Sequence, residues 1–359
     1  MKVAVACGGT GGHIFPGIAT ADELVRRGHE VTLWLAGKSI ESAAAAGWKG
    51  PSVTLCAAGF GSRFSLRALG TAWTLYRAGT EGRRRMRENR PDVLLGMGSY
   101  ASVGPILAAL RLRVPVVLHE ANVVPGRATR FFARRAKAVG ISFDGTSFYL
   151  RRANLVQTGM PLRRDIEAAA AALPPREFKP DLCTVLVMGG SAGAQRLNRE
   201  APPALATTAR SLPGLRVLHL SGRADETVVR ERYAELGLAA DVRAFTHEMP
   251  ELYKKADFAI SRSGAASCAE LSAFGLPSLL VPYPHAISDH QFENARAMEK
   301  CGAADVVADA DVASDWLAEY LAARLPNTAK RGQMSRAALS RAQSSGASAL
   351  ADLVERTVS

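Results

Sequence analysis

Two glycine-rich segments, one opening each half of the chain, constrain the fold more than any other feature. Gly8–His13 follows the apolar run Lys2–Cys7, and Gly189–Ala194 follows the apolar run Thr184–Met188. A short buried strand that passes through a glycine loop into a helix opens a βαβ unit with a parallel sheet. The sequence therefore predicts an α/β protein with two Rossmann-like parallel-sheet domains, which face each other across a cleft.

Short apolar runs alternate with helical patterns along the rest of the chain, as parallel α/β folds require. Further strands are predicted at Val31–Ala36, Val93–Gly96, Val114–His119, Arg216–Leu220, Phe258–Ser261 and Ser278–Val281. Helices are predicted at Gly17–Arg27, from about Ala194, from about Ala265 to Gly275 and at Ala347–Val358.

Gly159 and Pro161 interrupt the chain near its middle and favour a connection between domains there, within Thr158–Arg163. We expect an N-terminal domain at 1–160 and a C-terminal domain at 161–339. The Ala- and Pro-rich segment Ala168–Pro180 predicts a surface excursion of the second domain. By these patterns alone, the last helix, about 340–359, can pack on either domain.

The chain carries 45 Lys and Arg against 33 Asp and Glu, a net charge of +12. This surplus attracts nucleic acid, acidic lipid or phosphorylated substrate without distinguishing them. The five cysteines form no CxxC pair, which argues against a zinc site or disulfide framework and fits a reducing compartment. The best candidate for a membrane span, Val103–Leu118, is interrupted by Arg111 and Arg113, so we expect any membrane contact to be peripheral.

The stretch from Arg262 to Glu270 is the most informative for chemistry, because it links a predicted strand to a predicted helix. The open N–H groups at the start of such a helix can hold a diphosphate. Glu270, about one and a half turns in, can accept hydrogen bonds from both hydroxyls of a ribose. A solvated helix carboxylate is the competing interpretation. In the next loop and helix, Gln291 can donate and accept at once, which suits a sugar hydroxyl.

Other ligand classes fit these residues less well. Neither glycine loop follows the G-x-G-x-x-G pattern, and no acid follows the second strand, so a nicotinamide dehydrogenase is disfavoured. His285 and His290 lack the carboxylate–His spacing of a metal site. Asp309-Ala310-Asp311 resembles a D-x-D metal–nucleotide motif, but such a sequence is common by chance and is badly placed here, so we do not interpret it as a metal site.

Together, these segments resemble the motifs of the MurG family, which transfers N-acetylglucosamine from a UDP-sugar to lipid I and so forms lipid II. The matching segments occur in order over nearly the whole chain: Gly8–Gly17, Gly96–Tyr100, His119–Asn122, Gly189–Ala194, Arg262–Glu270 and Asp289–Asn294. The resemblance implies a GT-B fold, a last helix that crosses back to the first domain, and inversion at the anomeric carbon without a metal or another cofactor. Met160, Ser99 and Ala121 stand where the family usually has Asn, Gly and Gln.

Roles for individual residues also follow from the resemblance. Arg163 and Thr246 would lie near the uracil, Ser191 and Ala265–Ala266 near the diphosphate, and Glu270 at the ribose, while Asn122 and Gln291 would contact the N-acetylglucosamine. The implied donor residues are Asn122, Arg163, Ser191, Thr246, Ser263, Gly264, Ala265, Ala266, Ser267, Cys268, Ala269, Glu270 and Gln291. The implied acceptor and phosphate loops contain Thr10, Gly11, Gly12, Gly98, Ser99 and Tyr100. His13 is the candidate base, because imidazole can take a proton near neutral pH. Orienting a phosphate or packing the loop is an equally weighted role for His13.

The resemblance also implies partners and a location. The donor would be UDP-N-acetylglucosamine and the acceptor undecaprenyl-linked lipid I, at the cytoplasmic side of the inner (plasma) membrane, in peptidoglycan synthesis, cell shape and cell division. Other cell-wall proteins are possible partners, and nucleic acid is not expected. A related transferase acting on a diacylglycerol or sterol is the alternative, and a non-enzymatic UDP-sugar-binding protein is a distant third.

The stretch Gly59–Arg90 combines apolar and cationic side chains in the way that an interfacial segment requires. The expected membrane contacts are Phe64, Leu66, Leu69, Trp73, Arg83, Arg84 and Arg85. A helix whose apolar side packs on its own domain is the competing interpretation.

Overall fold

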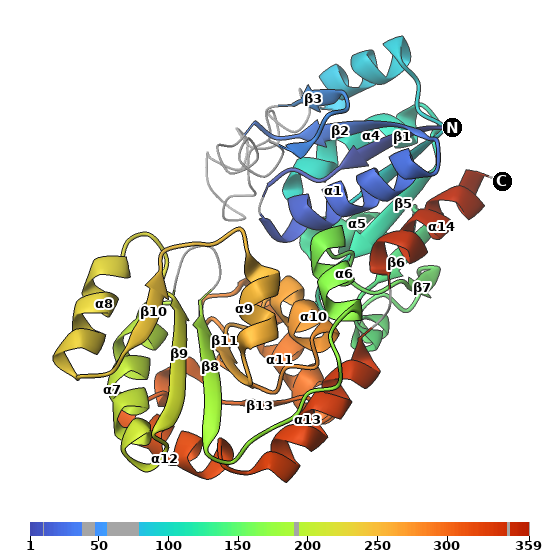
Figure 1. Ribbon diagram of the computed structural model, residues 1–359. Coiled ribbons are helices and arrows are strands. Elements are labelled where there is room, and N and C mark those ends of the chain that lie inside the picture. The colour runs from blue at the N-terminus through green and yellow to red at the C-terminus, as the bar shows by residue number, and fades with distance from the viewer. Residues whose placement is uncertain (10, 38–46, 56–78, 190–193, 343–344, 359) are drawn as a thin grey trace. The chain divides into compact units, whose positions relative to one another are not determined.

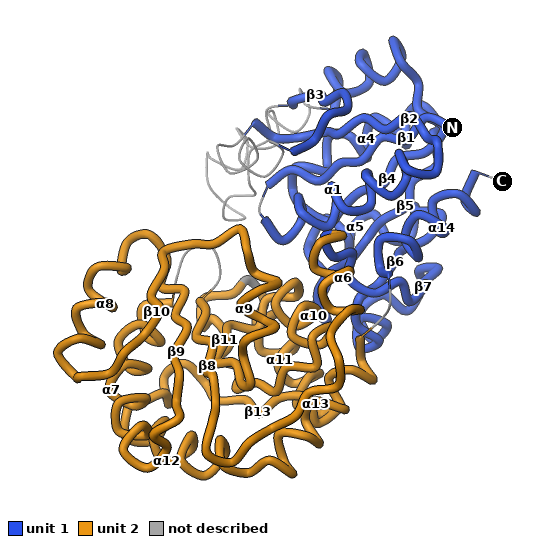
Figure 2. Tube along the Cα trace, in the orientation of Figure 1, with its two compact units in different colours: residues 1–163, 345–359 blue, residues 164–344 orange. Residues whose placement is uncertain are grey.

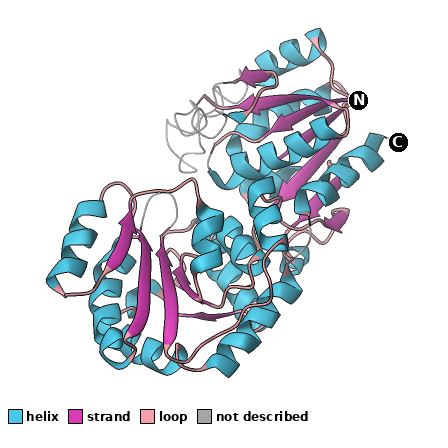
Figure 3. Cartoon of the chain, in the orientation of Figure 1, coloured by secondary structure: helices cyan, strands magenta, loops and turns pink. Residues whose placement is uncertain are grey.

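The computed structural model describes the chain apart from residues 10, 38–46, 56–78, 190–193, 343–344 and 359 (Figure 1). The chain divides into two compact units, which we call unit 1 and unit 2 (Figure 2). Unit 1 comprises Met1–Arg163 and Ser345–Ser359, and unit 2 comprises Arg164–Ser344. In each unit, helices flank a β-sheet (Figure 3). Within the described ranges, no helix has both the length and the apolar composition needed to cross a bilayer.

In its described part, unit 1 contains a sheet of seven parallel strands in the order β3-β2-β1-β4-β5-β6-β7. The strand order changes direction between β1 and β4. Ligands of open α/β sheets bind at such a switch point, outside the carboxyl ends of the strands. The strands are β1 (Lys2–Ala6), β2 (Glu30–Leu35), β3 (Ser52–Thr54), β4 (Val93–Gly96), β5 (Val116–Glu120), β6 (Ala138–Ile141) and β7 (Leu155–Gln157). The helices include α1 (Gly11–Arg26), η2 (Tyr100–Ser102), α4 (Val103–Arg111), α5 (Arg127–Phe132), η3 (Asp144–Phe148) and α14 (Gly346–Val358).

Unit 2 repeats this arrangement with six parallel strands, again counted over the described residues, in the order β10-β9-β8-β11-β12-β13. Its switch point lies between β8 and β11. The strands are β8 (Leu182–Met188), β9 (Gly214–Leu220), β10 (Ala240–Arg243), β11 (Phe258–Ser261), β12 (Ser278–Leu280) and β13 (Ala304–Val306). The helices are α6 (Arg164–Ala171), α7 (Gln195–Ser211), α8 (Glu226–Glu235), α9 (Met249–Lys255), α10 (Ala265–Ala273), η4 (Ile287–Asp289), α11 (His290–Lys300), η5 (Asp309–Asp311), α12 (Ser314–Arg324) and α13 (Thr328–Arg341).

Residues of β1 alternate between the two faces of the sheet in unit 1. Val3 and Val5 join a buried cluster with residues of α1 and α14, whereas Ala4 and Ala6 join a second cluster with residues of α4 and α5. Side chains of a strand point to opposite faces in turn, and helices here cover both faces. This explains why the predicted strands are apolar throughout. The prediction of an α/β fold with two parallel sheets is confirmed.

The first helix begins earlier than the sequence predicts. It starts at Gly11 and not at Gly17, so Gly11, Gly12 and His13 form its first turn. Gly17 serves another purpose, because a Cβ at this position would lie 2.2 Å from Cys7 Cβ. The glycine allows α1 to pack closely on β1 and does not mark the start of the helix.

The last helix, α14, packs against α1 in unit 1. Arg27 Nη1 lies 2.5 Å from Asp352 Oδ1 and 2.7 Å from Glu355 Oε2. On the apolar side of α14, Leu350 and Val354 are fully buried in the core cluster of β1. Burial of this face and ion pairs at its rim hold the end of the chain on the first sheet.

The segment after α6 lies at the surface of unit 2, since none of the residues 168–180 is buried, and one side chain anchors it there. Ala168–Ala171 belong to α6. Arg176 then donates hydrogen bonds to the carbonyl oxygens of Tyr253, Ala256 and Phe274 over 2.6, 2.5 and 2.7 Å. These carbonyls stand at the C-terminal ends of α9 and α10, where unpaired acceptors attract a cation. Composition did not reveal this anchor because it depends on helix ends far along the chain.

Candidate active site

At the switch point of unit 1, the loop after β1 contacts the loop after β4. Ser99 Oγ donates a hydrogen bond to the carbonyl oxygen of Gly8 over 2.5 Å and accepts one from the N–H of Ala101 over 3.1 Å. Gly9 has a φ of +120°, and a Cβ on it would lie 3.3 Å from Ser99 Cβ. Conformation and space both favour glycine at position 9. The structure thus brings together the two loops predicted on the acceptor side.

Two histidines lie near each other at this edge of unit 1. His13, in the first turn of α1, is half-buried, whereas His119, in β5, is buried. His119 Nε2 lies 3.1 Å from the carbonyl oxygen of Gly159 and 3.2 Å from Ser142 Oγ. Burial, with a smaller contribution from the charge of His13, lowers the pKa of His119 to about 4. His119 is therefore neutral at neutral pH, and His13 is the partly exposed member of the pair.

A buried carboxyl group shapes the loop after β5. Glu120 Oε1 accepts hydrogen bonds from the N–H of Asn122 over 3.1 Å and from its side-chain amide over 3.5 Å. Glu120 Oε2 accepts one from the N–H of Gly126 over 3.0 Å. Burial raises the pKa of Glu120 above its ordinary value. Glu120 thus holds the loop that carries Asn122, and Asn122 is half-buried there.

At the switch point of unit 2, α10 follows β11 after a short loop. Its N-cap residue, Gly264, has an extended backbone (φ −60°, ψ 147°) and makes no side-chain hydrogen bond to the first turn. The first N–H groups of a helix have no partner inside the helix, so those of Ala265 and Ala266 are available beyond its start. The helix dipole adds positive potential at the same place. This end of α10 can bind an anion such as a diphosphate.

Arg262, just before α10, has a structural role. It is buried, and its Nη1 lies 2.5 Å from Asp309 Oδ1 and donates to the carbonyl oxygens of Val281 and Pro282 over 3.1 and 3.2 Å. Arg262 therefore fixes the loop after β12. Asp309 is the first acid of the D-x-D sequence and belongs to the short helix η5, and its carboxylate pairs with Arg262.

The start of α11 is tied to the start of α10. Ser263 Oγ donates to the carbonyl oxygen of Gln291 over 2.8 Å, and the side-chain amide of Asn294 donates to the carbonyl oxygen of Ser263 over 3.1 Å. Gln291 Oε1 accepts from the N–H of Tyr283 over 3.0 Å, so its Nε2 hydrogens are the donors it can offer to a ligand. Asp289, the N-cap of α11, has a φ of +51°, an uncommon conformation outside glycine that often occurs at functional sites.

Glu270 is not a solvated helix residue. It is half-buried, and its Oε2 accepts a hydrogen bond from the hydroxyl of Tyr253 over 2.6 Å. Tyr253 is only 1% exposed and packs on Phe274, with ring centroids 5.0 Å apart. Arg176 holds the Tyr253 carbonyl. The carboxylate therefore has a defined position within α10.

The chain resembles known proteins along nearly its whole length. Residues 3–141 match the glycosyltransferase family 28 N-terminal domain, and residues 184–354 match the glycosyltransferase family 28 C-terminal domain. A UDP-N-acetylglucosamine--N-acetylmuramyl-(pentapeptide) pyrophosphoryl-undecaprenol N-acetylglucosamine transferase from Geobacter sulfurreducens is 37% identical over 357 residues, which cover 98% of this chain and 97% of that protein. The protein of the same name from Brucella suis is 35% identical and covers 99% of this chain and 94% of its own length.

Among solved structures, the crystal structure of MurG from Acinetobacter baumannii matches with a TM-score of 0.81 at 26% identity, over 99% of both chains. The chain belongs to the MurG family. The resemblance seen in the sequence motifs is thus confirmed, and so is the GT-B fold class.

Three residues depart from the usual MurG pattern, and all three are buried. Ser99, in place of the usual glycine, bridges the loops after β1 and β4 through its hydroxyl. Met160, in place of the usual asparagine, is buried, and its sulfur accepts a hydrogen bond from Ser142 Oγ over 3.8 Å. Ala121, in place of the usual glutamine, is also buried. The side chains of Met160 and Ala121 are thus both buried within unit 1.

Not every predicted MurG donor residue presents a side chain to a ligand. Cys268 is buried, burial raises the pKa of its thiol to about 12, and its N–H bonds to the carbonyl oxygen of Gly264 over 2.9 Å. Thr246 is buried, and its Oγ1 accepts from the N–H of Glu248 over 3.0 Å.

The predicted residues are also divided between the units. Asn122 and Arg163 belong to unit 1, whereas Glu270 and Gln291 belong to unit 2. Six predicted positions lie outside the described residues: Thr10, Ser191, Phe64, Leu66, Leu69 and Trp73.

Sequence reasoning missed Tyr253, Arg176 and the positioning role of Glu120. No spacing rule links Tyr253 or Arg176 to Glu270, because each contact crosses between separate elements. A signal existed for Glu120, since an acid inside an apolar strand is rarely buried without a purpose. Over the described residues, no group of three or more His, Cys, Asp and Glu is arranged to hold a metal ion. The expectation of a reaction without a metal stays a prediction.

Proposed function

We propose that this protein transfers N-acetylglucosamine from UDP-N-acetylglucosamine to the 4-hydroxyl of the muramoyl pentapeptide of undecaprenyl-pyrophosphate-linked lipid I. The product is lipid II, an intermediate of peptidoglycan synthesis. The observation that carries this proposal is the match, at 35–37% identity over nearly full length, to relatives whose name states this transfer. Their name also favours a muramoyl acceptor over a diacylglycerol or sterol.

Unit 2 holds the donor in this proposal. The N–H groups of Ala265 and Ala266 bind the diphosphate, where the helix dipole adds to their hydrogen bonds. Glu270 accepts hydrogen bonds from the ribose hydroxyls, and Gln291 donates to the N-acetylglucosamine. As the sugar leaves the phosphate, negative charge grows on UDP, and the start of α10 stabilises it. This stabilisation is what a metal supplies in other transferases.

Tyr253 acts as a positioning residue for the donor. Its hydroxyl donates a hydrogen bond to Glu270 Oε2, so the carboxylate is held in one orientation before the ribose binds. Tyr253 is itself fixed by burial and by Arg176. A group that is already oriented loses less entropy on binding, which raises affinity without a direct contact.

Unit 1 carries the proton chemistry in this proposal. His13 takes the proton of the acceptor 4-hydroxyl while that oxygen bonds to the anomeric carbon and the bond from that carbon to the phosphate oxygen breaks. Attack opposite the leaving group inverts the anomeric configuration. His119 contacts the Gly159 carbonyl and the Ser142 hydroxyl at hydrogen-bond distance. Because it is neutral, it does not add a second positive charge beside His13. Gly11 and Gly12 leave the start of α1 open to the acceptor.

The acceptor carries a long polyprenyl chain, so the reaction takes place at a membrane surface. We place the protein peripherally on the cytoplasmic side of the inner (plasma) membrane, because UDP-sugars are cytoplasmic substrates. Contacts with other cell-wall proteins belong to the same proposal.

Transfer is tested with radiolabelled UDP-N-acetylglucosamine and a short-chain, water-soluble lipid I analogue. We expect a β-linked disaccharide product, and we expect Glu270→Ala to lower the yield at limiting donor. A diacylglycerol acceptor serves as the control. Absence of transfer to the muramoyl analogue, or preferred transfer to diacylglycerol, would overturn the proposal.

A further inference from the structure

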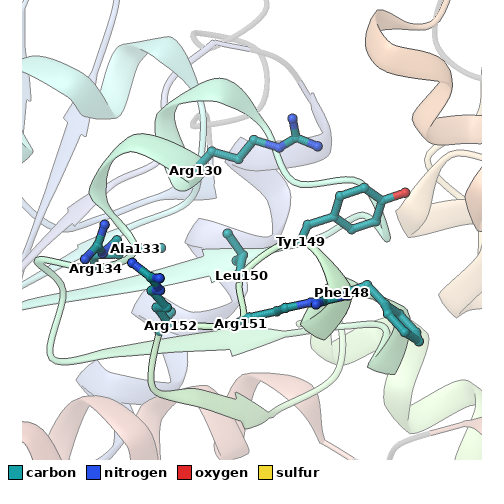
Figure 4. A pocket seen from close by; sticks show the side chains of 9 residues that line it. Arg130, Ala133, Arg134, Phe148, Tyr149, Leu150, Arg151 and Arg152 are labelled. Carbon is teal, nitrogen blue, oxygen red and sulfur yellow. The ribbon is translucent and has the colours of Figure 1, made fainter.

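A small pocket on unit 1 is lined by residues of α5, of η3 and of the segments that follow them. Four arginines line it (Figure 4). Arg130 lies on α5, Arg134 lies just after α5, and Arg151 and Arg152 follow η3. The cavity has a volume of about 270 Å³. Pockets that enclose a whole small molecule typically measure roughly 300–1,000 Å³. This pocket therefore suits one compact group.

The charge around the pocket is strongly unbalanced. All four arginines are exposed, and within the described part of the chain none of them pairs with a carboxylate. Between residues 127 and 152 the chain contains seven Lys and Arg and one acid, Asp144. Gathering guanidinium groups around one hollow costs Coulomb energy, which an anion offsets. Arginine is also the side chain best suited to bind a phosphate through two parallel hydrogen bonds.

Aromatic side chains stand exposed beside these arginines. Phe148, which lines the pocket, is 72% exposed, Tyr149 is 43% exposed, and Phe131 on α5 is 63% exposed. Arg130 lies over the Tyr149 ring, with 5.2 Å between guanidinium carbon and ring centroid. Exposed aromatic rings next to arginines are typical of segments that enter the headgroup region of a bilayer.

The arginines of helical residues 79–88 are different. Arg84 Nη2 lies 2.7 Å from Glu81 Oε1, and Arg85 Nε lies 2.9 Å from the same oxygen. Arg84 also lies 3.7 Å from Glu88. These bonds hold the pKa of Glu81 at about 2, so it stays charged. Of the three predicted membrane arginines, Arg84 and Arg85 are thus partly neutralised by acids of their own helix, whereas the pocket arginines are not.

We propose that the pocket of Arg130, Arg134, Arg151 and Arg152 binds the phosphate of an anionic phospholipid, with Phe148 and Phe131 entering the bilayer surface. The proposal rests on the proposed function, because a lipid-linked acceptor requires unit 1 to reach a membrane. It goes beyond that function by naming the surface that contacts lipid.

The test is co-sedimentation of the full chain with phosphatidylcholine vesicles that contain or lack phosphatidylglycerol, over a salt series. Arg151→Ser combined with Arg152→Ser should weaken binding to the anionic vesicles roughly twenty- to thirtyfold at low salt, since each arginine contributes by its charge near the surface. Phe148→Ser should weaken binding at unchanged charge. The matched control is Arg210→Ser with Arg216→Ser, two exposed arginines of unit 2, which should bind like the unchanged protein.

Two further arms separate the competing surfaces and ligands. Arg83→Ser, Arg84→Ser and Arg85→Ser together should reduce vesicle binding only roughly a few-fold, because surface ion pairs already offset part of their charge. Inorganic phosphate, glycerol 3-phosphate and a single-stranded oligonucleotide should compete weakly with the vesicles. Equal binding by the pocket variant and its matched control would overturn the proposal. The proposal would also be overturned if the pocket bound the soluble phosphates or the oligonucleotide and replacement of its arginines left vesicle binding unchanged.

Transfer to the water-soluble acceptor is measured on the same variants. We expect it to be unchanged, because the pocket residues lie outside the proposed catalytic and donor sites. Loss of vesicle binding with intact transfer supports the pocket, whereas absence of transfer by the unchanged protein would count against the proposed function alone.

Discussion

The carboxyl ends of the parallel strands carry different groups in the two units. In unit 1, His119 and Glu120 stand buried at the end of β5, and burial shifts the pKa of both. In unit 2, the same edge presents the start of α10 and a carboxylate, Glu270, that Tyr253 holds in place. Both units share the parallel sheet and its switch point, so the side chains of the loops make the difference. One edge is suited to handling protons and the other to holding a nucleotide.

The largest expected effect concerns the proton chemistry of unit 1. His13→Ala should lower kcat by ~10²–10⁴-fold, because a general base acts only in the transition state. Steady-state kinetics with the water-soluble acceptor at saturating donor measures this change. UDP affinity, measured by calorimetry, should stay the same. Near-normal turnover of the variant would make His13 a residue that only packs or orients the loop, and the contrast between the units would fail.

The second prediction concerns the buried histidine of unit 1. The pKa of His119 falls from 6.5 to about 4 on folding, so the unfolded chain binds the proton more readily. The stability that His119 contributes is therefore complete above pH 6.5 and is lost as the pH falls toward 4. The loss amounts to about 3 kcal/mol for a shift of this size.

Urea unfolding of the unchanged protein and of His119→Gln, from pH 7 to pH 4, measures this contribution. Glutamine keeps a donor for the Gly159 carbonyl but does not titrate. Burial raises the pKa of Glu120, so its pH dependence is opposite to that of His119. The stability that Glu120 contributes is complete below pH 4.5 and is lost as the pH rises. Because Glu120 is present in both proteins, its effect cancels in the difference. Parallel stability curves for the two proteins would show that His119 does not titrate in this way.

The third prediction concerns donor binding by unit 2. Glu270→Ala should weaken UDP and UDP-N-acetylglucosamine by about tenfold to a hundredfold, because hydrogen bonds to a charged group contribute roughly 1.5–3 kcal/mol. Calorimetry gives the two affinities. The pH dependence of kcat at saturating donor should keep its shape, since Glu270 takes no part in proton transfer. Unchanged UDP affinity in a folded variant would remove Glu270 from the ribose site.

The smallest expected effect tests how unit 2 positions its carboxylate. Tyr253→Phe removes one hydrogen bond to Glu270 and should weaken UDP binding by about two- to tenfold. With a UDP analogue that lacks both ribose hydroxyls, the unchanged protein and the variant should bind equally, because the carboxylate then has nothing to hold. An equal loss for both ligands would mean that Tyr253 supports the fold of unit 2 and does not orient Glu270.

The sequence by itself determined the elements and the fold class. Val93–Gly96 and Phe258–Ser261 were predicted as strands with the bounds that the structure has. Apolar runs and the glycine loops after them are local signals, because each reports only the burial and backbone freedom of neighbouring residues. The start of α10 was predictable for the same reason, since a helix N-terminus is a local feature. The order of motifs then identified the family.

The tertiary structure alone decided which side chains act together. Ser99 lies 91 residues from Gly8, and Tyr253 lies 17 residues from Glu270, yet each pair shares a hydrogen bond. The pocket arginines come from α5 and from the segment after η3. Periodicity shows which face of an element is buried, but it does not show which other element that face meets. Packing between elements sets those contacts, and with them the orientation of Glu270 and the burial that lowers the pKa of His119.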